Sequence, residues 1–281
     1  MSVMPSPSQK YATPKYAAIS LRRVRAIVLR HSYLIVSSWP RVLDLMYWPA
    51  VQMLMWGFLQ IYVSQNSGPF ARAASTFIGA VMLWDVLFRG QLGFSISFLE
   101  EMYARNMGNL MMTPLRPIEF VLALTIQSVI RLSIGIVPVS FLAIWFFDFN
   151  LWMMGLALAV FFLNLLLTSW AIGIIVSGIL LRHGLGAENM AWGFMFLMLP
   201  FVCVYYPVTV LPSWLQTVAW MLPPTYVFEG MRSLLIDHVF RADLMAQAFA
   251  LNAVLFGCGV AIFLVLLRSA RREGTLLQGG D

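Results

Sequence analysis

Three histidines are the side chains best suited to acid–base or metal chemistry, and His31, His183 and His238 stand in three separate stretches of the chain. The sequence has no His-x-x-x-His or Cys-x-x-Cys spacing and no Gly-x-Ser-x-Gly turn, so neither a metal box nor a nucleophile elbow is indicated. The only lysines, Lys10 and Lys15, lie in the amino-terminal tail and in no Gly-Lys-Ser/Thr loop that could cradle phosphates. We expect no catalysis and no cofactor or metal on this chain, and any ATP must be held by another polypeptide.

Charged side chains inside apolar stretches are the next candidates, because an ionised group is costly in lipid. Asp85 and Arg89 are four residues apart and share one helix face, and Arg131 lies in the following apolar stretch. Counted from the expected cytoplasmic helix ends, Asp85 and Arg131 lie at similar depth, about 20 Å in, at 1.5 Å per residue. An Asp85–Arg131 pair is therefore geometrically allowed, and Arg89 could share Asp85 or face a water-filled path. The favoured interpretation is an ion pair that fixes packing, and the alternative is an anion-attracting substrate path.

Trp56 lies near the middle of an unusually aromatic apolar stretch. Trp48 and Tyr62, near the two ends of that stretch, are explained as interfacial aromatic belts. Trp56 either packs between helices or offers its ring to a sugar or amphiphile, and packing is the favoured interpretation.

The composition requires a lipid environment for most of the chain. Its 281 residues are 60% hydrophobic and 11% charged, with a mean hydropathy of +0.81, whereas soluble domains carry about 25% charge. This excludes a disordered protein, a disulfide scaffold and an ordinary soluble enzyme. The net charge of +6 does not indicate nucleic acid, because no basic run with polar surface follows residue 41. We predict an all-α, polytopic membrane protein.

Six stretches are long and apolar enough to span the membrane, since a helix needs about 20 apolar residues for the hydrocarbon core. They are 42–63, 74–99, 118–147, 151–181, 190–211 and 246–267. The predicted organisation is a flexible cytoplasmic tail at 1–16, a basic amphipathic helix at 17–41, one transmembrane domain at 42–268 and a second cytoplasmic tail at 269–281.

The stretch 17–41 has apolar residues at helical spacing, interrupted by arginines. The apolar positions are Leu21, Val24, Val28 and Ile35, and the arginines are Arg22, Arg23, Arg25 and Arg30. Such a helix can lie in the headgroup layer with its arginines on lipid phosphates. The alternative is a cytosolic extension of the first span.

The distribution of Lys and Arg predicts the orientation, because short cytoplasmic flanks are enriched in them. Only Arg72, Arg232 and Arg241 fall on the side opposite the amino terminus. The other side holds Lys10, Lys15, Arg22, Arg23, Arg25, Arg30, Arg41, Arg105, Arg116, Arg182, Arg268, Arg271 and Arg272. Both termini are therefore expected in the cytoplasm.

The segment between the second and third spans is expected to form a short cytoplasmic helix at about 99–113, ended by Pro114 and Pro117. Its apolar patch is Met107, Leu110 and Met111, flanked by Glu101, Arg105 and Asn109. A charged helix with a methionine-rich patch can fill a groove on a partner. An ordinary interfacial connector is the alternative.

The segment 205–235 is too apolar for a free loop and too broken by proline for a span. Its marked positions are Pro207, Pro212, Trp214, Pro223, Pro224, Glu229 and Arg232. We expect a short helix at 214–221 and a second at 226–235. Together they would form a re-entrant cap at the extracytoplasmic side, with backbone ends buried in protein.

The order of these elements resembles the type-2 ATP-binding-cassette (ABC) permeases over residues 17–270. The resemblance is carried by Gly-Asn-Leu-x-x-Thr-Pro at 108–114, Tyr-Pro-Val-x-x-Leu-Pro-x-Trp-Leu-Gln at 206–216, Leu-Pro-Pro-Thr at 222–225 and Glu-x-x-Arg at 229–232. It implies a multi-pass subunit of the plasma membrane, bacterial inner membrane included, that pairs with a second permease copy as a homodimer. It also implies two separate ATPase subunits that hold ATP and Mg.

The resemblance further implies that the helix between the second and third spans is the coupling helix that contacts the ATPase. Glu101, Arg105, Gly108, Asn109, Leu110 and Pro114 fall at that contact. The chain departs from the family at Asn109, where Thr is frequent, and at Met111, where an acidic residue is frequent.

The function implied is export of an amphiphile such as a lipid-linked glycan or polysaccharide, driven by ATP hydrolysis on the partner. Aromatic residues in the first span beside Arg89, and no line of acidic residues for a cation, favour this substrate class. Export of a lipophilic drug or antibiotic is the alternative. Two other classes stay open, namely an ATP-independent secondary transporter using Asp85, and a membrane enzyme using His183, His238 or Asp85.

Overall fold

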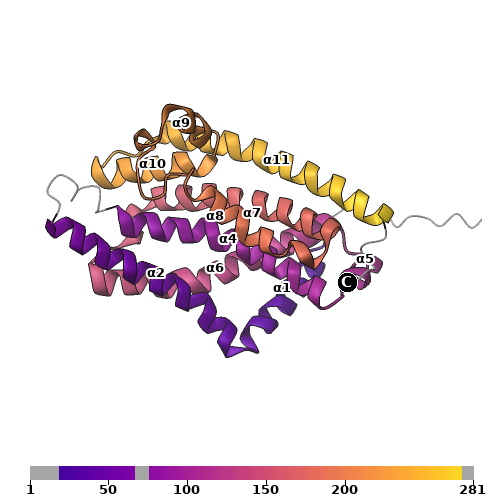
Figure 1. Ribbon diagram of the computed structural model, residues 1–281. Coiled ribbons are helices and arrows are strands. Elements are labelled where there is room, and N and C mark those ends of the chain that lie inside the picture. Colours follow the sequence, from indigo (N-terminus) through magenta and orange to yellow (C-terminus); the bar gives the residue numbers. More distant parts are fainter. Residues whose placement is uncertain (1–18, 67–75, 274–281) are drawn as a thin grey trace, which may run out of the picture.

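The computed structural model describes residues 19–66 and 76–273, and within these ranges the chain forms helices and no strands (Figure 1). The all-helical fold predicted from composition is therefore confirmed. The α-helices are α1 (Leu21–Val36), α2 (Trp39–Asn66), α4 (Phe77–Tyr103), α5 (Met107–Met112), α6 (Pro117–Phe147), α7 (Leu156–His183), α8 (Asn189–Met198), α9 (Ser213–Trp220), α10 (Pro223–Ile236) and α11 (Ala242–Glu273). Short 3₁₀ turns occur at η2 (Leu151–Met154), η3 (Leu185–Ala187) and η4 (Val208–Val210).

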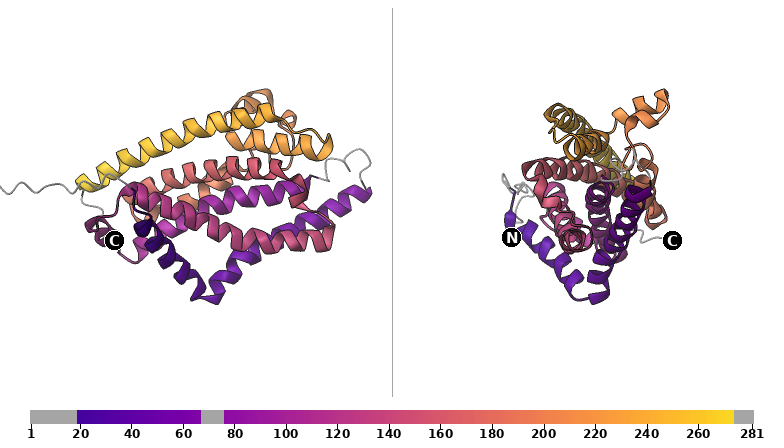
Figure 2. Two further views of the ribbon diagram at one scale, coloured as in Figure 1. Left: turned by 180° about the vertical axis from the view of Figure 1, so that it is seen from behind. Right: turned by 90° about the vertical axis from the view of Figure 1, so that its left-hand side faces the viewer.

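Five of these helices, α2, α4, α6, α7 and α11, are long and apolar enough to cross a membrane. They correspond to the predicted first, second, third, fourth and last spans. Helix α4 is the most enclosed of them, because it packs against α7 on one side and against α6 and α2 on the other. Helix α11 lies along α7 at one outer face of the bundle, and α1 and α2 lie at the opposite face (Figure 2).

The predicted span at 190–211 is not a continuous helix, which corrects the sequence-based expectation. Helix α8 ends at Met198, and turns follow up to the 3₁₀ turn η4. Pro200 explains the break, because proline has no N–H to donate and clashes with the preceding helical turn. Ten helical residues extend about 15 Å, roughly half of the hydrocarbon thickness.

Two ends of the bundle can be defined from α5 and α10. The α5 end holds α5 and the carboxy-terminal parts of α4, α7 and α11. One pocket shows this proximity, because it is lined by Met107 of α5, Phe98 of α4, Leu181 of α7 and Leu267 of α11. The α10 end holds α9, α10 and the start of α4, where Gly79 lies against Met231 and Leu235 of α10. The chain from His183 to Pro223 thus runs from the α5 end to the α10 end through α8 and the irregular stretch after it.

Helix α1 forms a V with α2, and the turn at Ser37 and Ser38 lies at its vertex (Figure 1). Its buried face is Val24, Ile27, His31 and Ile35. These residues follow the three- and four-residue steps of an amphipathic helix. Leu21 was expected on the apolar face but is 80% exposed. The buried face of α1 therefore begins at Val24 and does not include Leu21.

The contact between α7 and α11 contains a buried polar group of three side chains. The Asn252 amide donates to the Asn164 main-chain oxygen at 3.0 Å, and the Thr168 hydroxyl donates to Asn252 Oδ1 at 2.6 Å. Hydrogen bonds between helices in an apolar environment stabilise one packing register, because an alternative register leaves these groups unpaired.

Helices α4 and α6 approach closely where glycine removes a side chain. A Cβ on Gly93 would lie 3.1 Å from Cα of Ser128, and a Cβ on Gly135 would lie 2.7 Å from the main-chain oxygen of Leu45 in α2. These contacts hold α2, α4 and α6 at short separation.

The predicted tails fall mostly outside the described residues. Residues 1–16 are not described, and neither are residues 274–281. Residues 269–273, expected in the carboxy-terminal tail, belong to α11, which ends at Glu273.

Candidate functional site

The segment between α4 and α6 differs from the single short helix expected at 99–113. Helix α4 continues to Tyr103, a turn occupies residues 104–106, and α5 has only six residues. Arg105 in the turn has a φ of 51°, the left-handed conformation that commonly ends a helix. Pro117 at the first turn of α6 and Glu119, whose carboxylate accepts the Arg116 N–H at 3.0 Å, start the next helix.

The predicted partner-contact residues separate into exposed and buried positions. Arg105, Asn109 and Pro114 are exposed, and Gly108 and Leu110 are half-buried. Glu101 is 1% exposed beneath α1. The expectation that Glu101 lies on an outward contact surface is therefore wrong, because α4 runs one turn longer than predicted and turns this residue inward.

Glu101 joins three elements at the α5 end. Its Oε2 accepts from Arg30 of α1 at 2.8 Å and from the Asn106 amide at 2.7 Å. Its Oε1 lies 3.2 Å from Nε2 of His31. Asn106 is the residue directly before α5, so this carboxylate connects the start of α5 with α1.

Glu100, the carboxylate next to Glu101, binds Arg131 of α6, the third predicted span. Both of its oxygens lie 2.8 Å from Nη2 of Arg131 in α6. Oε2 of Glu100 also lies 3.2 Å from Nδ1 of His31, and Oε1 lies 3.7 Å from Arg41. We define the acid cluster as Glu100, Glu101 and the cationic side chains around them, His31, Arg30, Arg41 and Arg131.

The Asp85–Arg131 pair that equal depth allowed does not form. Arg131 extends toward Glu100 at the α5 end instead. A long arginine side chain reaches the polar end of a helix while its stem stays among apolar groups, so equal backbone depth does not decide its partner. Asp85 pairs within its own helix, because Nε of Arg89 donates to Asp85 Oδ2 at 2.8 Å. Of the two alternatives for Arg89, the structure has the one in which Arg89 binds Asp85.

The Asp85–Arg89 pair adjoins an aromatic group on α4 and α8. Phe88 contacts the rings of Trp84, Trp192 and Phe196 with centroids 6.0, 5.9 and 5.7 Å away. The Arg89 side chain is 12% exposed, and Trp192 and Phe196 are largely exposed. Arg89 itself lies on the α6 side of α4, where its Cδ would be 3.6 Å from a Cβ on Gly135.

Trp56 of α2 packs between elements. Its ring stacks on Tyr205 with centroids 4.1 Å apart and meets Phe77 edge-on at 5.9 Å. This arrangement agrees with the packing interpretation, and it ties the middle of α2 to the irregular stretch that follows α8.

The segment 205–235 contains helices near both predicted positions, α9 and α10. Arg232 of α10 is buried and donates through Nη2 to the main-chain oxygens of Cys203, Val204 at 3.1 Å and Tyr206 at 2.7 Å. Glu229 lies 3.0 Å from Nη1 of Arg232 and accepts the Val208 N–H at 2.7 Å. We define these two residues as the cap clamp, because they satisfy the backbone polar groups that the break after α8 leaves without helical partners.

The prolines and the tryptophan marked in this segment lie at the ends of short elements. Pro207 precedes the turn η4, Pro212 precedes α9, and Pro223 and Pro224 begin α10. Proline at the start of a helix costs no hydrogen bond, so each marks a boundary. Trp214 is exposed on α9.

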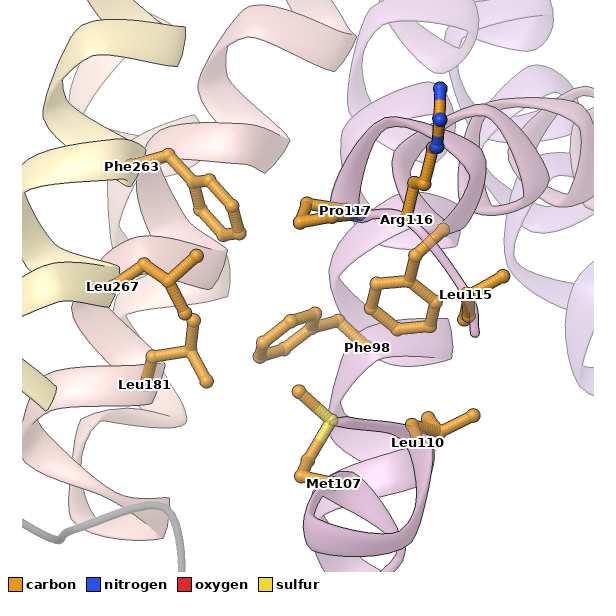
Figure 3. A pocket seen from close by; sticks show the side chains of 10 residues that line it. Phe98, Met107, Leu110, Leu115, Arg116, Pro117, Leu181, Phe263 and Leu267 are labelled. Atoms are coloured by element: carbon orange, nitrogen blue, oxygen red, sulfur yellow. The ribbon is translucent and has the colours of Figure 1, made fainter. Parts of the chain in front are cut away.

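A pocket of about 70 Å³ lies beside α5 (Figure 3). Met107 of α5 and Phe98 of α4 point toward Phe263 and Leu267 of α11, and Leu110 also lines the pocket. Arg116 lies at its edge beside Pro117. Helix α5 is thus incompletely packed against α7 and α11.

The acid cluster was missed by sequence reasoning, apart from Glu101. His31 was considered only as a catalytic candidate, and Glu100 was assigned no role. A signal was present, because His31 lies on the same helical face as Val24, Ile27 and Ile35, and a buried ionisable residue requires a partner. A second missed pair, Arg23 with Glu119 at 2.6 Å, fixes the start of α1 to the start of α6.

His31 is fully buried between the two carboxylates. Burial opposes the charged ring, but the hydrogen bonds and the charges of Glu100 and Glu101 outweigh burial and raise the pKa of His31 above its ordinary value of 6.5. Each ring nitrogen faces a carboxylate, which accepts and cannot donate when ionised, so the doubly protonated imidazolium fits this position.

A family model described as ABC-2 type transporter matches residues 28–236, from the middle of α1 to the end of α10. The comparison with curated proteins finds no match. The matched range includes four of the five candidate spans, the acid cluster, α5 and the cap clamp. The chain belongs to the ABC-2 type transporter family, as a membrane permease subunit.

Proposed function

We propose that this chain is the permease subunit of an ABC exporter and that the α5 end docks on a separate ATPase subunit that holds ATP and Mg. The observation that carries the proposal is the segment 105–114 at one end of a helical bundle of the ABC-2 type transporter family, in which Arg105, Asn109 and Pro114 are exposed. Arg105 and Asn109 supply polar contacts on this segment, and Leu110 supplies an apolar one.

The proposed orientation has the α5 end and both termini in the cytoplasm of a bacterial inner membrane. Arg22, Arg25, Arg105, Arg116 and Arg182 belong to helix ends or turns at the α5 end, which supports this side as cytoplasmic by the positive-inside rule. The sixth crossing is proposed to run through α8 and the irregular chain after it. Helices α9 and α10 then form the extracytoplasmic cap, held by the cap clamp.

The functional unit is proposed to contain two permease copies and two ATPase subunits. The transport path would involve Arg89, on the side of α4 that faces α6, and the aromatic rings of Phe88, Trp192 and Phe196, where α4 meets α8. An arginine can attract a phosphate or other anionic headgroup, and aromatic faces stack on sugars or apolar chains. This combination supports an amphiphile, such as a lipid-linked glycan or polysaccharide, as the substrate.

The proposed mechanism transmits ATPase closure through α5 to the spans on either side of it. Helix α5 connects to α4 through a three-residue turn and to α6 through a short proline-containing linker, so a displacement of α5 acts on both helices. The movement is driven by ATP, which binds one of two states of the partner ATPase more tightly than the other. The side chains of this subunit transmit the displacement of α5 to the spans and catalyse no reaction.

The proposal predicts ATP-dependent transport that requires the partner. The permease is co-reconstituted into proteoliposomes with its candidate ATPase partner, and movement of a fluorescent lipid-linked oligosaccharide across the bilayer is followed with and without ATP. We expect transport only with both proteins and ATP, and an Arg105→Glu substitution is expected to reduce the rate about tenfold or more, because charge reversal at a docking contact costs several kcal/mol.

Two outcomes would contradict this proposal. Equal transport by the permease without ATPase, driven by a proton gradient and abolished in Asp85→Asn, would indicate a secondary transporter. ATP-dependent movement of a lipophilic cation with none of the oligosaccharide would retain the exporter and replace the substrate class by a lipophilic drug. Arg241→Glu, an exposed arginine at the α10 end, is the matched control and is expected to transport normally.

A further inference from the structure

The geometry points to a role for α1 in setting the position of the docking segment. We propose that His31 and Glu101 are positioning residues for α5, with Glu101 as the link between α1 and Asn106 and with the proton on His31 as the condition for that link. The inference rests on the proposed function in that α5 is taken as the docking segment.

The first step is the connection itself. The Asn106 amide donates to Glu101 at 2.7 Å, and Asn106 Oδ1 accepts from the Asn109 amide at 3.3 Å. Main-chain bonds run from Asn106 N to the Glu101 oxygen and from Leu110 N to the Asn106 oxygen. The start of α5 is therefore attached to Glu101 through both its side chain and its backbone.

The second step is the charge balance around His31. Glu100 and Glu101 of α4 face its two ring nitrogens, each at 3.2 Å. Arg30 on α1 bonds to Glu101, Arg131 of α6 bonds to Glu100, and Arg41 of α2 lies 3.7 Å from Glu100. If His31 loses its proton, one ring nitrogen presents a lone pair to a carboxylate oxygen, and that contact becomes repulsive.

The third step is the direction of the pH response. Because the pKa of His31 is raised in the folded chain, its attachment is complete below pH 6.5 and is lost as the pH rises through the raised pKa. Above that pH, α1 holds Glu101 through Arg30 alone. Glu101 then constrains Asn106 less, and α5 opens more often.

The fourth step is the space available for such movement. The pocket beside α5 separates Met107 and Leu110 from α11, and Met112 is 81% exposed. Met107 is buried and Leu110 is half-buried, and a helix of six residues is not stable without such tertiary contacts. The position of α5 therefore depends on these contacts and on its two connections, of which the Glu101–Asn106 contact is the one at its start.

The test measures hydrogen exchange of the amides of residues 104–110 in the full-length permease in lipid nanodiscs at pH 6.0 and pH 8.5. Labelling times are adjusted so that intrinsic exchange is equal at the two pH values. The native chain is expected to exchange about fivefold faster at pH 8.5, the effect of losing one partly screened charge-assisted contact. His31→Gln, of similar size and without a titrating proton, is expected to exchange fast at both pH values.

Matched variants separate positioning from folding. Asn106→Ala breaks the link on the α5 side, leaves α1 in place and is expected to remove the pH response as well. His183→Gln changes an exposed histidine outside the acid cluster and is expected to keep the native response. An equal pH response in the native chain and in His31→Gln, or an unchanged response in Asn106→Ala, would overturn the inference.

A second readout distinguishes this inference from the proposed function. Affinity of the ATPase for the nanodisc-embedded permease is measured at both pH values, and we expect it to fall at pH 8.5 in the native chain only. Binding that is tight and independent of pH would refute positioning by His31 and would leave the proposed function intact. Absence of ATPase binding at every pH would refute the proposed function, while the exchange data would still decide the link between His31 and α5.

Discussion

Replacing Arg232 by alanine is expected to prevent recovery of the folded permease. The guanidinium is buried and holds main-chain oxygens of Cys203, Val204 and Tyr206 together with the Glu229 carboxylate. Its removal leaves these acceptors without donors and leaves a half-buried carboxylate without its cation. Breaking one partner out of a buried ion pair typically costs about 3–5 kcal/mol, which is a large part of the stability of a domain.

The measurement is the fraction of detergent-solubilised protein that elutes as a single monodisperse species, together with its midpoint of thermal unfolding. Arg232→Lys is expected to recover only part of both, because an ammonium has no planar fork to reach several carbonyl oxygens at once. Arg241→Ala is the control, since Arg241 is exposed and pairs with Asp243 two residues away. Native-like elution of Arg232→Ala would contradict the cap clamp.

Replacing Asp85 by leucine is expected to destabilise the permease more than replacing Arg89 by leucine. The pair lies inside α4 with both side chains largely buried. A guanidinium left alone keeps its charge in the apolar environment, whereas a carboxyl group left alone can take up a proton and become neutral. We expect a cost of about 3–5 kcal/mol for Asp85→Leu, measured as the loss of stability toward denaturant in detergent.

The double variant separates the two roles considered for this pair. Asp85→Leu with Arg89→Leu is expected to fold nearly as well as the native chain, because removing both members of a buried pair is often close to neutral. A double variant that folds, binds the ATPase and does not transport supports Arg89 as part of the path. One that folds and transports normally shows that the pair serves packing alone, and one that does not fold contradicts both interpretations.

The long helices could be predicted because their signal is carried by composition over many residues. Stretches of about 20 apolar residues have few alternatives to a spanning helix, and α2, α4, α6, α7 and α11 were found this way. The amphipathic spacing of α1 was equally direct. Its phase was wrong at Leu21, which is exposed although Val24, three residues later, is buried.

The break after α8 could be predicted less well, although Pro200 signalled it. Proline is tolerated in membrane helices when neighbours satisfy the freed carbonyl groups, so its presence did not exclude a continuous span. Here Arg232, which lies 26 to 29 residues further along the chain, provides the neighbouring donors. That partnership depends on the tertiary fold and has no local pattern in the sequence.

The partners of charged side chains were the least predictable part of the candidate site. Counting residues from helix ends places backbones at similar depth, but the Arg131 side chain is long enough to reach Glu100 instead of Asp85. The inward turn of Glu101 depended on α4 continuing to Tyr103, and helix ends are hard to place to within a turn. The acid cluster follows from these two details together.

The central claim is that the exposed segment around α5 contacts a separate ATPase from the cytoplasmic side. Its most direct test is site-specific cross-linking in intact cells, with a photoreactive residue at position 109 of the permease and a control at exposed position 214 on α9. We predict a cross-link to the ATPase from position 109 and none from position 214. A cross-link to the ATPase from position 214 but not from position 109, or labelling of position 109 by a membrane-impermeant reagent added outside the inner membrane, would contradict the account.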